Sequence, residues 1–371
     1  MRPSGYADER FGPVADAFAR NFDDFPELGA AVAVYAGGRK VVDLTGGIAD
    51  EATGRPWTSE TVVPVFSCAK ALVSLSIHLL VEQGRLDLDA PVAAYWPEFG
   101  KESITSRMVL GHRAGLPVLD RTLSFDEIAA WTPVVHAIEE QEPLWEPGTT
   151  YEYHGHVFGF LLGEVIRRIT GLTPGQYFRK AIGEPLGLRA WIGLPADELD
   201  DRARLLEAEG RPPMPPPEHL LTRIVTMNGA LNFPGLDEPH GWNDPALLTI
   251  ELPGAGAVAS ADGLAGLFTT TVSGKDRLLS PATLTDALTE VSSGKGYLGF
   301  DVGARWGSGF LLDSPFRPML GARSFGNDGA GGQFAFGDDE HGVAFAYVAN
   351  RMIGHGDARA SNLVTAVRDC L

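Results

Sequence analysis

The stretch PVFSCAKALVSLSIHLLVEQG, residues 64–84, carries the strongest structural signal in this sequence. An apolar lead-in is followed by good helix formers, with apolar residues at three- and four-residue spacing. Gly84 can adopt the left-handed conformation that often ends a helix. The pattern predicts a helix over residues 67–83 that begins at or next to Ser67.

Ser67 and Lys70 form an S-x-x-K pair in this stretch. Three residues are just under one helical turn, so the Lys70 Nζ can reach the Ser67 Oγ from the same face. A serine hydroxyl is a weak nucleophile until a base takes its proton, and a desolvated lysine can serve as that base. The first helical turn also points free N–H groups at a developing oxyanion. The pair therefore predicts a nucleophile and its base.

The same S-x-x-K pattern occurs again as SSGK, residues 292–295, where a glycine interrupts any helix. The motif by itself is weak, and a structural role for Ser67 remains an alternative. Its apolar lead-in and its place at the start of a buried helix favour Ser67. Other signatures are absent from the sequence, including G-x-S-x-G, H-E-x-x-H, C-x-x-C and the phosphate-binding loop.

Composition narrows the class of protein. The 371 residues, 44% hydrophobic and 21% charged, suffice for one large domain or two smaller ones. A net charge of −18 disfavours nucleic acid and anionic membrane surfaces as partners. Cys68 and Cys370 have no metal or redox spacing. Because residues 1–22 contain no apolar signal core and the apolar run 69–81 is too short to span a bilayer, we expect a cytoplasmic protein.

Strand patterns lie at both ends of the chain, and helical patterns lie between them. Two β-branched runs within residues 28–47 flank Gly37 and Gly38, which predicts a hairpin. The further predicted elements are helices over 157–170 and 176–186, closed by Gly171 and Gly187, a Pro-rich loop over 211–219, strands over 309–312, 332–336 and 343–348, and a final helix over 357–370.

Four segments together resemble the serine β-lactamase and DD-peptidase superfamily, and most closely its class C-like esterases, the family VIII carboxylesterases. They occur in the family's order and are residues 64–99, ITSRMVLGHRAGLP (104–117), EPGTTYEYHGHVFGFLLGEVIRRITG (146–171) and FGNDGAGG (325–332). The resemblance implies an α+β fold of the β-lactamase/transpeptidase type. An antiparallel sheet domain (1–75 and 255–371) would pack against a mainly helical domain (76–254), with the active site between them.

The resemblance also implies roles for individual residues. Ser67 would be the acylated nucleophile, Lys70 its base and Tyr153 a second proton relay, which either takes the hydroxyl proton or protonates the leaving group. The backbone N–H groups of Ser67 and Ala330 would form the oxyanion hole. Aromatic packing is the alternative role for Tyr153, whose register from the P-G-T turn at 147–149 favours the catalytic one.

Two motifs depart from the β-lactamase pattern. Tyr153-His154-Gly155 stands where Tyr-x-Asn is usual, and Asn327-Asp328-Gly329 stands where β-lactamases have Lys-Thr-Gly and the esterases often have His-x-Gly. The amide that would hold a β-lactam side chain and the cation that would bind its carboxylate are both missing, which favours esters. His154, Asn327 and Gly329 remain possible substrate-binding residues, although Asn327 is equally well explained as a turn residue.

The sequence thus predicts a carboxylesterase that acts on a small or medium ester or acyl donor through an acyl-enzyme, without metal or cofactor. An acyltransferase or amidase on the same scaffold, a weak β-lactamase and a catalytically silent binding protein are the alternatives. His112 and His156 could lie near the site but are more often structural. Four tryptophans could line an acyl pocket or fill the core: Trp131, Trp145, Trp242 and Trp306.

Overall fold

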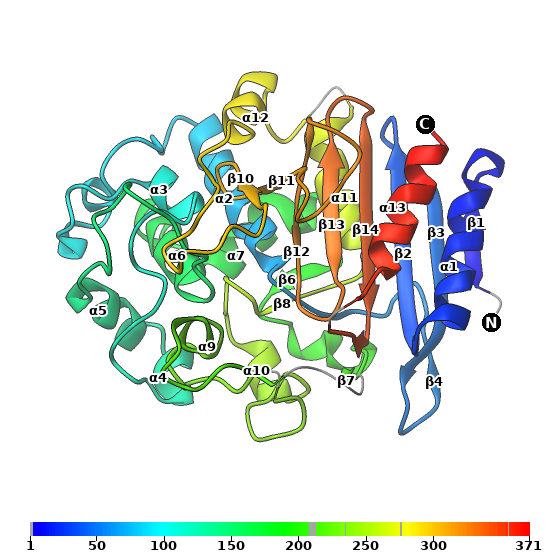
Figure 1. Ribbon diagram of the computed structural model, residues 1–371, viewed down its shortest axis with the longest axis horizontal. Helices are drawn as coiled ribbons and strands as arrows, with labels where there is room; N and C mark the ends of the chain where they lie inside the picture. The colour runs from blue at the N-terminus through cyan, green and yellow to red at the C-terminus, as the bar shows by residue number, and fades with distance from the viewer. Residues whose placement is uncertain (1–2, 208–212, 234, 275–276, 355) are drawn as a thin grey trace.

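The structure of the chain, a computed structural model, describes residues 3–207, 213–233, 235–274, 277–354 and 356–371. Strands from both ends of the chain form one antiparallel sheet, and the helices between them form the other side of the molecule (Figure 1). This confirms the predicted α+β class. The proposed division at 75/76 and 254/255 stays a prediction.

The main sheet has the order β1-β3-β2-β14-β13-β12-β11-β10-β9, with β4 paired to β3. Its central pairs are antiparallel, and β2 joins the C-terminal strands through β14. The strands are β1 (Ser4–Ala7), β2 (Gly29–Ala36), β3 (Arg39–Asp50), β4 (Arg55–Pro56), β9 (Ser292–Ser293), β10 (Arg305–Trp306), β11 (Leu311–Leu312), β12 (Ser324–Asp328), β13 (Phe334–Asp338) and β14 (Val343–Ala349).

Alternating side chains explain how β14 is covered on both faces. Phe345 and Tyr347 point into the core beneath α1 and α13, whereas Ala344 and Ala346 point into the opposite core, where α11 packs. Figure 1 shows α1 and α13 side by side on one face of the sheet. The small alanines allow α11 to approach the sheet closely.

The helices are α1 (Gly12–Asp24), α2 (Ala69–Glu82), α3 (Ser106–Leu110), α4 (Phe125–Ala129), α5 (Thr132–Glu140), α6 (Val157–Thr170), α7 (Pro174–Phe178), α8 (Glu184–Leu186), α9 (Leu220–Thr226), α10 (Pro245–Thr249), α11 (Ala261–Val272), α12 (Pro281–Ala287) and α13 (Arg359–Asp369). Helix α2 is buried along most of its length and contacts α6, α7, α12 and β12. It therefore joins the helical part to the sheet. Of the described helices, none has the length and apolarity needed to cross a membrane.

Two smaller sheets complete the fold. One has the order β5 (Val63–Phe66), β8 (Ala257–Ala259), β6 (Ala190–Ile192), and the other pairs β7 (Leu206–Glu207) with β15 (Arg351–Met352). The first brings the strand before Ser67 against a segment nearly two hundred residues later in the chain.

The glycine signals in the sequence correspond to turns in the structure. Gly37 and Gly38 have φ of 59° and 79° between β2 and β3, and Gly84 has φ of 66° after α2. Both the hairpin and the α2 helix are therefore confirmed. Gly171 and Gly187 also have positive φ at helix ends.

Other helix and strand boundaries differ from the predicted ones. The helix expected over 176–186 is α7, a π-helical turn over 179–183 and α8. The strand expected from 332 begins at Phe334, because Gly331 and Gly332 have φ of 82° and 100°, outside the extended region. In the predicted Pro-rich loop, residues 211–212 lie outside the described residues, and 213–219 contain neither helix nor strand.

Candidate active site

Ser67 lies in the sharp turn between β5 and α2. Phe66 has φ of 46°, an unusual value for a residue with a side chain, and is held by its contacts with Trp242 and Phe233. The helix begins at Ala69, so Ser67 precedes it by two residues. The turn presents the Ser67 side chain to the pocket while Lys70 is carried inward on the first helical turn.

The structure brings together Ser67, Lys70 and Tyr153. The Tyr153 hydroxyl donates a hydrogen bond of 2.7 Å to the Ser67 Oγ, and the Lys70 Nζ lies 3.4 Å from the same oxygen. The Lys70 Nζ also donates to the Gly254 carbonyl at 2.7 Å and lies 4.6 Å from the centre of the Tyr153 ring. The Ser67 hydroxyl therefore lies within hydrogen-bond distance of a phenol and an amine.

Burial shifts the pKa values of Lys70 and Tyr153 in opposite directions. Desolvation lowers the pKa of Lys70 to about 7, although the Asp328 carboxylate partly opposes the shift. Desolvation also raises the pKa of Tyr153 above its usual value. At neutral pH a large fraction of Lys70 is an amine and Tyr153 is a phenol, so Lys70 suits the role of base and Tyr153 that of acid.

Two residues that line the same pocket have backbone N–H groups without a backbone acceptor in the described part of the chain. Ser67 and Ala330 both line it, and among the described residues neither N–H donates to a backbone carbonyl. Gly329 fits tightly against the strand before Ser67, since a Cβ at that position would lie 2.2 Å from the Val65 carbonyl oxygen. The loop and the nucleophile turn are thus in direct backbone contact.

The motif Asn327-Asp328-Gly329 lies partly in the pocket and partly in the core. Asp328 and Gly329 line the pocket, whereas Asn327 is 2% exposed and its carbonyl accepts a hydrogen bond from the Cys68 Sγ. The Asn327 Oδ1 has no hydrogen-bond partner among the described residues. Asp328 forms an ion pair of 2.7 Å with Arg317. Sequence reasoning assigned no role to Asp328, the carboxylate of this motif that faces the pocket.

The histidines form a buried layer behind Tyr153. His154 is fully buried and outside the pocket lining; its Nδ1 lies 2.7 Å from the Glu152 carbonyl, and its Nε2 accepts from the Leu116 N–H. Burial lowers the pKa of His154 to about 4 and that of His112 well below its usual value. His112 packs with its ring centre 5.0 Å from that of Tyr153. Both are neutral at pH 7, and the His112 ring supports that of Tyr153.

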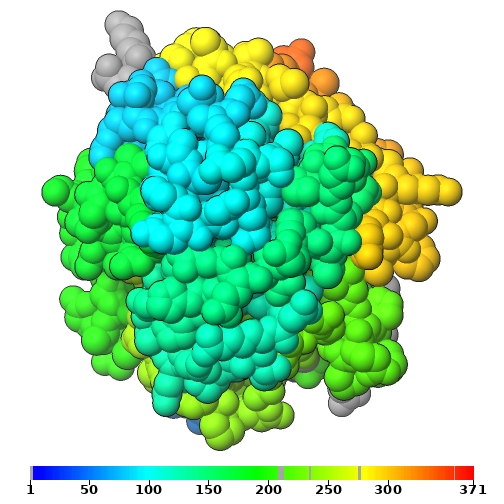
Figure 2. Space-filling view, turned by 90° about the vertical axis from the view of Figure 1, so that its left-hand side faces the viewer, coloured from blue at the N-terminus to red at the C-terminus, as the bar shows by residue number. Residues whose placement is uncertain are grey.

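A largely apolar pocket of about 430 Å³ opens above Ser67. Apolar side chains from three segments form its walls: Tyr151, Leu221, Leu298, Phe300, Val302, Ala304, Trp306 and Phe316. Phe300, Val302 and Phe316 are unusually exposed for large apolar residues, at 68%, 58% and 43%. In Figure 2 the segments near residues 300 and 220 lie one above the other at the right-hand edge.

Glu152 links this wall to Tyr153. One carboxylate oxygen accepts from the Tyr153 N–H at 3.2 Å and the other from the Leu298 N–H at 2.9 Å. Local sequence patterns do not predict the contact between Glu152 and Leu298, because the two segments are far apart in the chain. The one feature of the sequence that pointed to Glu152 was its position directly before Tyr153.

The other sequence candidates divide between the pocket wall and positions away from the pocket. Ser292 is on β9 and its hydroxyl donates to the Gly111 carbonyl, so the second S-x-x-K match is not helical. Of the tryptophans, Trp306 lines the pocket and Trp242 is a core residue against Phe66. Within the described part of the chain, no group of three or more His, Cys, Asp or Glu side chains is arranged to hold a metal ion.

Comparison with known proteins gives a family match and a similar curated protein. The family model described as Beta-lactamase matches residues 18–368. The chain is 31% identical over 398 residues to the protein named Esterase/beta-lactamase LipL of Mycobacterium tuberculosis, which covers 95% of this chain and 84% of that protein.

Solved structures extend the likeness over the whole chain. A crystal structure of a family VIII carboxylesterase is similar with a TM-score of 0.90 at 30% identity, and a penicillin-binding protein homologue from Caulobacter crescentus with 0.88 at 33%, each covering 100% of both chains. The resemblance inferred from the four motif segments is confirmed, and the chain belongs to the Beta-lactamase family.

Proposed function

We propose that the chain is a carboxylesterase that hydrolyses small to medium, uncharged apolar esters through an acyl-enzyme on Ser67. The observation that carries the proposal is the position of the Ser67 Oγ, 2.7 Å from the Tyr153 hydroxyl and 3.4 Å from the Lys70 Nζ, beside an apolar pocket. The printed names of two similar proteins, an esterase/beta-lactamase and a family VIII carboxylesterase, support it. The chain is a serine hydrolase of the esterase type.

Acylation would begin with attack of the Ser67 Oγ on the ester carbonyl carbon. The hydroxyl proton passes to the neutral Lys70 Nζ, and the carbonyl oxygen becomes an oxyanion that accepts from the N–H groups of Ser67 and Ala330. When the C–O bond to the alcohol breaks, Tyr153 protonates the leaving alkoxide. Tyr153 then recovers a proton from the Lys70 ammonium, and the alcohol departs.

Deacylation reverses these roles with water in place of the alcohol. A water molecule attacks the acyl carbon and gives its proton to the Lys70 amine. The Ser67 Oγ leaves as the acyl bond breaks and is reprotonated from the same pair. The products are the carboxylic acid and the free enzyme, so no other reactant is needed.

The pocket chemistry favours esters over β-lactams. A β-lactam antibiotic carries a carboxylate, which needs a cation for tight binding. Among the described residues that line the pocket, the charged side chains are Glu152 and Asp328, both acidic. The nearby Arg317 is already paired with Asp328 at 2.7 Å. An anionic substrate would meet repulsion rather than a partner.

Steady-state hydrolysis of p-nitrophenyl acetate, p-nitrophenyl butyrate and nitrocefin tests the proposal. We expect the wild type to turn over both esters and to hydrolyse nitrocefin far more slowly, and Ser67→Ala to lose ester turnover. Ser292→Ala, which changes the serine of the second S-x-x-K match, is the control and should retain activity. Nitrocefin turnover faster than ester turnover would establish a β-lactamase instead, and absence of all turnover would favour a silent binding protein.

A further inference from the structure

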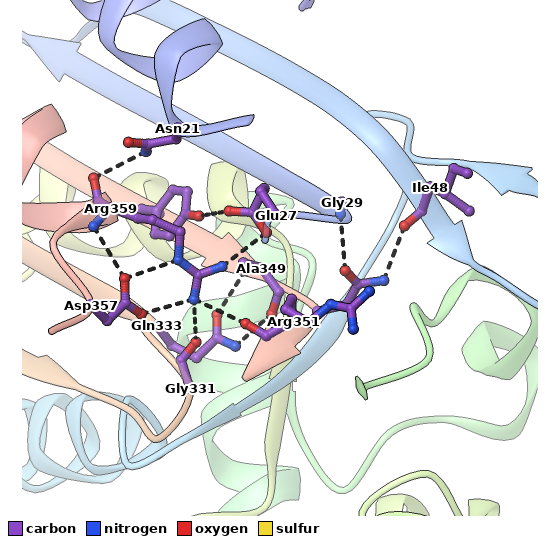
Figure 3. A network of polar contacts seen from close by, with 12 residues as sticks. Asn21, Glu27, Gly29, Ile48, Gly331, Gln333, Ala349, Arg351, Asp357 and Arg359 are labelled. Carbon is purple, nitrogen blue, oxygen red and sulfur yellow. Dashed lines mark hydrogen bonds and ion pairs between the residues drawn. The ribbon is translucent and has the colours of Figure 1, made fainter. Parts of the chain in front are cut away.

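Arg359, at the start of α13, is fully buried beneath the sheet (Figure 3). Its Nε and Nη2 donate to the two carboxylate oxygens of Asp357 at 2.9 and 2.8 Å, and its Nη1 donates to Glu27 at 2.9 Å. The Tyr347 hydroxyl donates to the other oxygen of Glu27. A buried guanidinium needs such partners because desolvation of an unpaired charge is costly.

The same guanidinium also binds two backbone carbonyls. The Arg359 Nη2 lies 2.9 Å from the carbonyl oxygens of both Gly331 and Arg351. Gly331 directly follows Ala330, which lines the pocket and whose N–H donates to no backbone carbonyl among the described residues. The charged cluster at the far side of the sheet is therefore connected to the loop beside Ser67.

This loop, residues 329–333, is held at several points. The Gly329 N–H donates to the Gln333 carbonyl at 2.8 Å, and the Gln333 side chain exchanges hydrogen bonds of 2.7 and 2.9 Å with the backbone of Ala349 on β14. Gly332 leaves room for the cluster, because a Cβ there would lie 2.4 Å from the Asp357 Oδ2 and 2.7 Å from the Arg359 Nη2.

Ala330 thus lies between two fixed points. On one side Gly329 presses against the Val65 carbonyl, and on the other the Gly331 carbonyl is bound by Arg359. We propose that Arg359 is a positioning residue for the oxyanion hole, which acts through the Gly331 carbonyl to hold the Ala330 N–H toward the reacting carbonyl oxygen. The inference rests on the acyl-enzyme mechanism proposed above.

The need for several donors explains why an arginine fills this position. A guanidinium offers five N–H donors in a planar fork, whereas a lysine ammonium offers three from one point. Arg359→Lys would keep the charge beside Glu27 and Asp357 but lose the hydrogen bond to the Gly331 carbonyl. The loop would then be free to shift. Since an oxyanion forms only during reaction, such a shift should lower kcat with little change in KM.

The test compares Arg359→Lys with Leu363→Ala, which opens a cavity under the same helix without touching the loop. Leu363 is fully buried in the core beneath α13. For each variant we would measure thermal unfolding, kcat and KM for p-nitrophenyl butyrate, and inhibition by an alkyl boronic acid, whose tetrahedral adduct on Ser67 places an oxygen in the oxyanion hole. Formation of a Ser67 adduct with a fluorophosphonate in the wild type is established first.

We expect Arg359→Lys to lower kcat about tenfold or more and to weaken boronic acid inhibition by a similar factor, with KM within about threefold, since loss of a whole oxyanion-hole donor costs about 100- to 1,000-fold. Leu363→Ala should lose thermal stability while keeping kcat. A folded Arg359→Lys with wild-type kcat and inhibition would overturn the inference, as would an equal loss of kcat in both variants.

A second variant covers the case in which Arg359→Lys does not fold. Asp357→Asn keeps the size of a side chain that is 11% exposed and removes one acceptor of the guanidinium. It should lower kcat and boronic acid affinity together by several-fold, with unchanged KM. If it leaves both unchanged, the positioning role is wrong. If instead the wild type forms no Ser67 adduct, the proposed mechanism itself fails, which is a different outcome.

Discussion

The Tyr153 hydroxyl donates its hydrogen bond to the Ser67 Oγ at 2.7 Å, and burial keeps the phenol protonated at neutral pH by raising its pKa. Tyr153 is therefore placed to give a proton to a leaving alkoxide. Tyr153→Phe should lower kcat/KM for ethyl butyrate about 100-fold or more, as expected for loss of a general acid.

The loss should be smaller for p-nitrophenyl butyrate, because p-nitrophenolate leaves without a proton. Hydrolysis of both esters by wild type and variant measures the difference. Tyr177→Phe, on α7 and outside the pocket lining, is the matched control. Equal losses for the two esters would contradict a role in protonating the leaving group.

The lowered pKa of Lys70, about 7, predicts the pH dependence of the reaction. The base must be neutral, so kcat/KM should rise with pH through about 7 and then level off. In Lys70→Arg the side chain stays charged at every accessible pH, which should remove this limb together with most of the activity. A pH–rate profile from 5 to 9 provides the measurement, and a flat profile down to pH 5 would show that another group is the base.

The apolar wall predicts a preference for longer acyl chains or alcohols. Each buried methylene contributes about 0.8 kcal/mol, or roughly fourfold in kcat/KM. Phe300 lines the pocket while 68% exposed, so Phe300→Ser should reduce the butyrate-over-acetate preference about threefold with little effect on stability. Leu186→Ser, at an exposed apolar residue outside the pocket lining, is the control. An unchanged preference in Phe300→Ser would show that the acyl chain of the substrate does not bind against Phe300.

Close packing at Gly329 predicts a sensitive position. A Cβ there would lie 2.2 Å from the Val65 carbonyl oxygen, so Gly329→Ala must displace the loop from the nucleophile turn. We expect kcat to fall at least tenfold and stability to drop by about 1–3 kcal/mol, as for other overpacked sites. Gly12→Ala, where a Cβ meets no atom within 4 Å, should do neither. The measurements are kcat and the free energy of unfolding in urea for both variants.

Local sequence signals predicted much of the fold. The hairpin about Gly37 and Gly38 and the helix ending at Gly84 follow from periodicity and from residues that tolerate positive φ. Ser67 and Lys70 were recognisable because they are three residues apart at the start of a predicted helix. Tyr153 was found through its register after the P-G-T turn, that is, through a local motif.

Features that depend on tertiary contacts gave no comparable signal. The pairing of β5 with β8, the Glu152 link to the Leu298 N–H and the Arg359 contact with Gly331 each join segments distant in the chain. The pocket wall near Phe300 lies in an irregular segment without hydrophobic periodicity. Its function as a wall arises from the segments it faces, which a single sequence does not specify.

Intact-mass spectrometry after incubation with a fluorophosphonate tests the central role of Ser67 most directly. The wild type should gain the mass of one phosphonyl group, peptide mapping should place it on Ser67, and Ser67→Ala should gain none while keeping its fold. A phosphonyl adduct that persists in Ser67→Ala, or that maps to another serine in the wild type, would contradict the account.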